Sequence, residues 1–173
     1  MPRPFTPRIT RRLFAALAPL LLATAPALAL AQQPAFTLPQ LKAFVALSPD
    51  AFRQELKRQG FSYADKTVTD EVSMIEYEKF DGDHTVHLMK STYVARRAGE
   101  DSIQLSLTDK AAFERLVKEA RDAGYAPAEK GRIPGGETYQ QFKRGNDNDV
   151  VRFVHPQKAS GMGRPSYTAV VWR

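Results

Sequence analysis

The residues best suited to bind a metal ion stand around one turn, at Asp81, Asp83, His84 and His87. The chain contains no cysteine, so a transition-metal site would have to use carboxylate and imidazole ligands. Side chains alternate between the two faces of a strand, and a strand after this turn would point His84 and His87 to opposite faces. We therefore interpret the turn as the polar tip of a hairpin and expect no metal site there.

A second oxygen-rich run extends from Asn146 to Asp149. Calcium prefers several oxygen ligands of this kind. The run lacks the glycine and the distal glutamate of an EF-hand loop, however, and hairpin tips are commonly polar. We interpret it as a solvated turn, and we expect no calcium bound to it.

Residues for nucleophilic or acid–base catalysis are sparse. His155 precedes Ser160 by five positions, but no serine lies in a Gly-x-Ser-x-Gly elbow. Glu76 and Glu78 share one face of a predicted strand and are suited to proton transfer if a cleft surrounds them, yet nothing in the sequence predicts that cleft. These patterns favour a protein that is not an enzyme and that uses no cofactor.

The first 31 residues have the three parts of a signal peptide. Four arginines (Arg3, Arg8, Arg11 and Arg12) precede the apolar segment 13–22, and Ala29-Leu30-Ala31 provides a cleavage site. We expect cleavage after residue 31 and a protein that is exported to the periplasm or secreted. The pair Arg11-Arg12 also resembles a twin-arginine signal, so the general secretory route and the twin-arginine route both remain open.

The net charge of +6 derives mostly from this leader. Its four arginines are among the 25 basic residues, so the mature chain keeps 21 basic residues against 19 acidic ones. This small excess, with the basic pairs Lys57-Arg58 and Arg96-Arg97 interpreted as solvated surface, does not favour nucleic-acid binding. No apolar run of about 20 residues follows the leader, so we expect no stable membrane insertion of the mature protein.

The mature chain predicts a flexible lead over residues 32–40 and one α+β domain over residues 41–173. Ser48 is a good N-cap, Pro49 suits a first helical turn, and Gly60 provides a stop, which together predict a helix. The same features recur at Thr108-Asp109 and Gly124 and predict a second helix.

Strands are predicted around Tyr77 to Phe80 and Tyr139 to Phe142, at 85–94 and 150–155, and at 102–107 and 166–172. Tyr77 and Tyr139 are 62 residues apart, as are Phe80 and Phe142. We therefore predict two tandem α-β-β-β units, about 41–107 and 108–173, whose strands form an antiparallel sheet with the helices on one face. The segments 127–136 and 156–165 are predicted loops, because both are rich in glycine and proline.

This arrangement resembles, in topology, the beta-lactamase-inhibitor-like and related periplasmic modules. The resemblance covers Ser48 to Phe80 and Thr108 to Phe142, and it implies a binding protein without assigning any functional residue. Our hypothesis is a soluble binding module that recognises another envelope or secreted protein through its exposed sheet face and the two loops. Candidate contact residues are Tyr77, Tyr93, Tyr139, Met162 and Arg164, with Trp172 as a further possible anchor.

The alternative is a small envelope enzyme or ligand carrier with a pocket between the helices and the sheet. The two hypotheses differ in what occupies the interior. Bulky apolar side chains in the predicted core would leave room only for the binding module. The side chains expected to fill that space are Phe52, Leu56, Leu105, Phe113 and Leu116.

Overall fold

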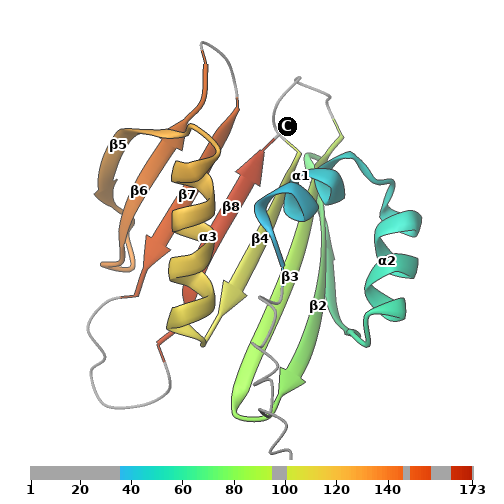
Figure 1. Ribbon diagram of the computed structural model, residues 1–173. Helices are drawn as coiled ribbons and strands as arrows, with labels where there is room; N and C mark the ends of the chain where they lie inside the picture. The colour runs from blue at the N-terminus through green and yellow to red at the C-terminus, as the bar shows by residue number, and fades with distance from the viewer. Residues whose placement is uncertain (1–35, 95–100, 146–148, 157–164, 173) are drawn as a thin grey trace, which may run out of the picture. The chain divides into compact units, whose positions relative to one another are not determined.

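One antiparallel sheet dominates the part of the chain that the computed structural model describes, which comprises residues 36–94, 101–145, 149–156 and 165–172. Its eight strands lie in the order β1-β2-β3-β4-β8-β7-β6-β5 (Figure 1). The strands are β1 (Ser62–Val68), β2 (Val72–Asp81), β3 (His84–Tyr93), β4 (Ser102–Leu107), β5 (Ala126–Arg132), β6 (Thr138–Lys143), β7 (Val150–His155) and β8 (Tyr167–Trp172). The two halves of the sheet meet where β4 pairs with β8.

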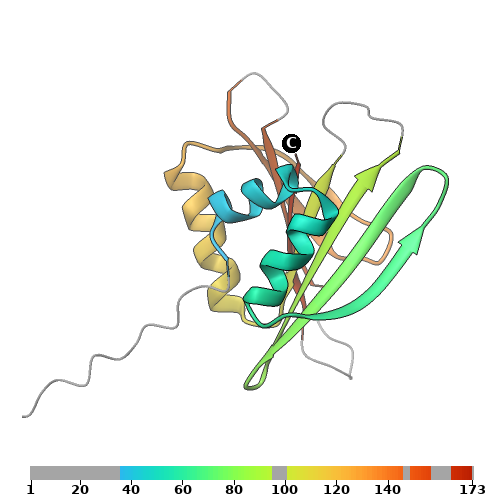
Figure 2. The same cartoon turned by 90° about the vertical axis from the view of Figure 1, so that its right-hand side faces the viewer.

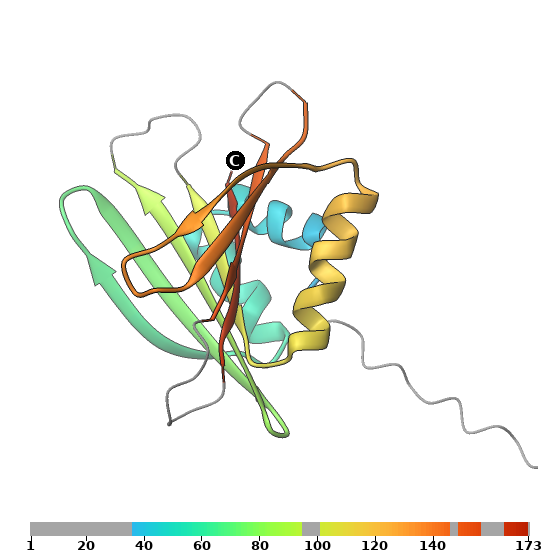
Figure 3. The ribbon, with the colours of Figure 1, turned by 90° about the vertical axis from the view of Figure 1, so that its left-hand side faces the viewer.

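Three helices in the described residues lie on one side of this sheet: α1 (Leu38–Ala46), α2 (Pro49–Arg58) and α3 (Lys110–Asp122). Figures 2 and 3 show the helices on that side from two opposite directions. The α+β class and the packing of helices on one face of an antiparallel sheet are therefore as predicted. Among the described residues, no helix has the length and apolar character needed to cross a membrane.

The helices that the sequence predicted begin and end close to their expected residues. In α2 the Ser48 side chain accepts a hydrogen bond from the Ala51 backbone N–H at 3.2 Å. After the helix, Gly60 takes a φ of +81°, which glycine adopts without a Cβ clash. In α3 the N-cap is Asp109, whose carboxylate accepts from the backbone of Ala111 and Ala112.

Each half of the sheet has four strands after its helix, so the prediction of three strands was wrong. The missed strands, β1 and β5, form the two edges of the sheet. Every residue of β1 is exposed, and no apolar alternation marks it. β5 contains Pro127 and Gly131, which an edge strand tolerates because one side of its backbone has no partner. Most of the predicted loop 127–136 is therefore strand.

The aromatic landmarks of the proposed repeat do not occupy equivalent positions. Tyr77 is 3% exposed and faces the helices, whereas Tyr139 faces the opposite side of the sheet. Phe142 is fully buried, whereas Phe80 is 68% exposed. The 62-residue spacing thus joins residues on opposite faces. The order of elements, and the left-handed glycines Gly60 and Gly124 after α2 and α3, still suggest two units.

Helix α1 begins at Leu38, inside the segment that the sequence analysis assigned to a flexible lead. Thr37 and Gln40 form a capping box at its start, with each side chain accepting from the backbone of the other residue. The apolar face of the helix is buried. At its end, the buried Lys90 of β3 donates from Nζ to the carbonyl oxygens of Phe44 and Val45, at 3.0 and 2.8 Å.

The space between helices and sheet is filled by apolar side chains. The five residues predicted to fill it, Phe52, Leu56, Leu105, Phe113 and Leu116, are each at most 2% exposed. Phe113 packs against Phe153 and Tyr167, with ring centroids 5.6 and 5.1 Å apart. These close-packed side chains support the sheet from the helix side.

Candidate functional site

The sheet face opposite the helices, here called the open face, is not covered by any helix or strand among the described residues (Figures 2 and 3). In β4 the alternation is clear, because Ile103 and Leu105 are buried while Gln104 is only half-buried. The cross-strand register extends this alternation over the whole sheet. It places on the open face Met74, Glu76, Glu78, His87, Met89, Gln104, Tyr139, Arg152, Val170 and Trp172.

Three of these residues form one cluster on β6, β7 and β8. The Arg152 guanidinium carbon lies 4.7 Å from the centre of the Tyr139 ring and 5.2 Å from that of Trp172. Its Nη2 donates to Gln141 Oε1 at 3.0 Å. The buried Nε has no hydrogen-bond partner among the described residues. We call Tyr139, Arg152 and Trp172 the Arg152 cluster, and it presents a planar cation between two aromatic rings.

Tyr139 is held in place by the edge strand β5. Its hydroxyl donates to Glu129 Oε1 at 2.5 Å. Glu129 raises the pKa of Tyr139, chiefly because its carboxylate accepts this hydrogen bond. Opposite the ring lies Gly131, where an added Cβ would be 2.8 Å from the ring atoms. Glycine therefore allows the aromatic ring to approach the backbone of β5 closely.

A shallow hollow of about 230 Å³ lies on the other half of the open face, over β2, β3 and β4. Its polar lining includes Glu76, His87, Gln104 and Ser106. Beside it, His87 Nδ1 is 4.0 Å from a carboxylate oxygen of Glu78. The open face thus combines an aromatic and cationic half with a half rich in hydrogen-bonding groups.

The predicted contact residues have different positions in the structure. Tyr139 belongs to the Arg152 cluster, and Tyr93 is half-buried on the open face at the end of β3. The prediction that Tyr77 contacts a partner was wrong, because the register of β2 turns its side chain toward α2. There its ring centroid lies 5.8 Å from that of Phe52. It is not available to a partner. Met162 and Arg164 lie outside the described residues.

Sequence reasoning missed Arg152 as a candidate. The signal was present in β7, where Arg152 separates the apolar residues Val151 and Phe153. That pattern indicates an outward-facing cation on a strand with a buried face. Its aromatic neighbours come from two other strands, however, and only the strand order brings them together.

The candidate ligands at the β2–β3 turn do not converge. His84 and His87 lie on opposite faces of β3, as period-two alternation predicted. Nδ1 of His84 is buried without a hydrogen-bond partner among the described residues. No group of three histidine, aspartate or glutamate side chains suited to a metal ion gathers in the described part of the chain.

The second candidate, from Asn146 to Asp149, is described only at its last residue. The Asp149 carboxylate accepts from the Tyr125 hydroxyl at 2.5 Å and from Arg144 Nε at 2.9 Å, and it pairs with Lys42 of α1. Desolvation, followed by repulsion from Arg144, lowers the pKa of Lys42 to about 8. These contacts engage the carboxylate in joining α1 to the β6–β7 hairpin.

The remaining catalytic candidates are only partly placed. Glu76 and Glu78 share the open face as expected, beside a shallow hollow and not in a deep cleft. His155 is exposed at the end of β7, and Ser160 lies outside the described residues. Of the basic pairs, Arg58 is paired with Glu55, and Arg96-Arg97 is not described.

Comparison with protein-family models, with curated proteins and with solved structures found no match to this chain. Function must therefore be inferred from the chain's own residues. We base this inference on the open face, because hydrogen bonds within the sheet hold several of its side chains in place.

Proposed function

We propose that this protein is an exported, non-enzymatic binding module that recognises another envelope or secreted protein through its open face. The observation that carries the proposal is the Arg152 cluster. Tryptophan, tyrosine and arginine are the residue types that contribute most to protein–protein binding energy. Here Tyr139, Arg152 and Trp172 are in contact on a face that the described elements leave uncovered.

The cluster is organised before a partner arrives. Glu129 and Gly131 fix the Tyr139 ring, and Gln141 fixes the guanidinium of Arg152. Side chains that are already ordered lose little conformational entropy on binding. Apolar residues next to the cluster, Val154 and Val170, extend the surface that a partner can bury.

Arg152 also suggests what part of the partner it contacts. It forms no ion pair within the described residues. A carboxylate on the partner can accept from the terminal nitrogens of the guanidinium, which two rings already flank. The partner is therefore expected to place an acidic side chain next to Arg152.

The alternative, an enzyme or ligand carrier with a pocket between helices and sheet, has less support. The side chains predicted to fill that interior are buried there. The hollow on the open face, at about 230 Å³, is below the roughly 300–1,000 Å³ common for small-molecule sites. Both observations favour recognition of a large partner by the open face over binding of a small molecule there or in the interior between helices and sheet.

Export is part of the same proposal. The basic, apolar and cleavage segments of residues 1–31 support it, and the absence of cysteine from the chain is compatible with an oxidising compartment. The mature protein is expected to begin at Gln32 and to meet its partner in the periplasm or outside the cell.

The experiment is affinity capture from the cell envelope and the secreted fraction with the purified protein. We expect one captured protein whose affinity falls about 30-fold or more in the Arg152→Ala and Trp172→Ala variants. The control is Tyr63→Ala, which removes an aromatic residue that is 59% exposed on β1, away from the cluster. Capture that is equally strong with all three variants would contradict the proposal.

A further inference from the structure

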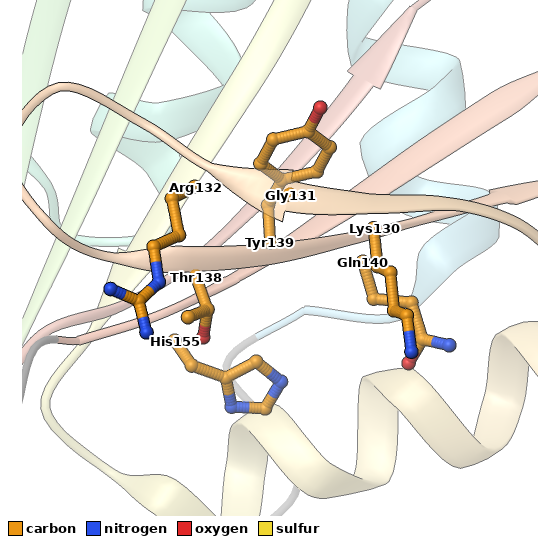
Figure 4. A pocket seen from close by; sticks show the side chains of 7 residues that line it. All are labelled: Lys130, Gly131, Arg132, Thr138, Tyr139, Gln140 and His155. Atoms are coloured by element: carbon orange, nitrogen blue, oxygen red, sulfur yellow. The ribbon is translucent and has the colours of Figure 1, made fainter.

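A hollow of about 450 Å³ lies at the end of the β5–β6 hairpin, on the side of the sheet that carries the helices. Figure 4 shows its side chains from close by. Lys130, Arg132, Thr138, Gln140 and His155 point to one side of the strands, and the Tyr139 ring points to the other. Tyr139 also lines the hollow, but its ring points away from it, so the hollow and the Arg152 cluster lie on opposite sides of β6.

The strand register accounts for this convergence. Lys130 pairs with Gln140, and Arg132 pairs with Thr138. Thr138 pairs in turn with His155 of β7. Because side chains alternate along a strand, Lys130 and Arg132, with Gly131 between them, point the same way. Three neighbouring strands therefore direct polar side chains into one space.

The imidazole of His155 is positioned by aromatic contacts. Its ring centre is 5.1 Å from that of Phe113 on α3 and 6.5 Å from that of Tyr167 on β8, both in edge-on geometry. An imidazole ring carries at least one N–H donor. His155 can therefore serve as a donor at one wall of the hollow while the aromatic rings restrict its movement.

The charges in the hollow are not balanced by the described residues. Lys130 and Arg132 form no ion pair within them, and the described lining contains no aspartate or glutamate. Two neighbouring cations without a counter-charge repel each other and create a positive potential in the concave space. An anion with two negative charges would match them.

We propose that this hollow binds a phosphate group, either as free phosphate or as the headgroup of a lipid. The arginine fork and the lysine ammonium supply charge-assisted hydrogen bonds. The Thr138 hydroxyl, the Gln140 amide and the His155 imidazole add further donors from other directions. A tetrahedral dianion accepts from several directions at once, whereas a carboxylate accepts within one plane.

The test is calorimetric titration of the mature protein, from Gln32 to Arg173, with inorganic phosphate, at an ionic strength held constant with chloride. A second arm uses vesicles of neutral lipid with and without phosphatidic acid. We expect saturable binding that is weakened about tenfold or more in the double variant Lys130→Gln/Arg132→Gln. Binding of phosphate in solution identifies free phosphate as the source, and binding only to the phosphatidic acid vesicles identifies a lipid.

The matched control is Lys57→Gln/Lys66→Gln, which also removes two exposed positive charges, but on α2 and on β1 at the opposite edge of the sheet. It is expected to bind as the parent does. Thr138→Val changes no charge and is expected to weaken binding by a smaller factor, which separates loss of a donor from loss of net charge. Absence of saturable binding in both arms, or equal weakening in the control, would overturn the proposal.

Discussion

Replacement of Phe113 by alanine is expected to lower the free energy of unfolding by about 3–5 kcal/mol. Phe113 is 1% exposed, and its ring contacts Phe153 and Tyr167 between α3 and the sheet. Removal of the ring loses its apolar burial and leaves a cavity that a close-packed core fills only in part. Domains of this size are commonly stable by only about 5–15 kcal/mol, and equilibrium denaturant unfolding measures the change.

Phe80→Ala is the matched control, because the same substitution is made at a side chain that is 68% exposed at the end of β2. It is expected to change the free energy of unfolding by no more than about 0.5 kcal/mol. Equal unfolding midpoints for the two variants would show that Phe113 does not anchor α3 to the sheet.

Replacement of Lys90 by methionine is expected to lower the free energy of unfolding by about 1–3 kcal/mol, because the Val45 carbonyl loses this donor while the Phe44 carbonyl still accepts from the Leu47 backbone N–H. Lys90 is 2% exposed, and its ammonium group donates to two carbonyl oxygens at the end of α1. Methionine preserves most of the apolar volume but donates no hydrogen bond. The Val45 carbonyl, left without this donor inside the protein, cannot recover the loss from water.

The loss should be accompanied by faster amide hydrogen exchange in α1, since the helix would lose its tie to β3. Lys66→Met on the exposed strand β1 is the control, and it should change neither quantity. Unaltered stability and exchange in Lys90→Met would contradict the role assigned to this lysine.

The elements with local signals were predictable from the sequence. Ser48 and Gly60 mark α2, and the alternation from Ser102 to Leu107 marks β4, because caps and buried faces act within a few neighbouring residues. The edge strands β1 and β5 were missed because neither buries an apolar face. These two strands are defined by their backbone hydrogen bonds to β2 and β6, and the composition of a segment does not predict such pairing.

The candidate site was predictable only in part. The sequence suggested aromatic residues on an exposed sheet face, and Tyr139 lies there, but Tyr77 was placed on the wrong face. Because side chains alternate along a strand, a shift of one residue in the strand register moves a side chain to the other face. Arg152 gained its role from neighbours on β6 and β8, which the strand order brings together from distant parts of the chain.

The central claim, that the open face contacts a partner protein, is tested most directly by site-specific photo-cross-linking in the producing cells. A photoreactive amino acid is placed at Met89, on the open face, or at Gln54, an exposed position of α2 on the opposite side. We predict a discrete cross-linked partner from Met89 and none from Gln54. A partner that cross-links to Gln54 and not to Met89 would contradict the claim.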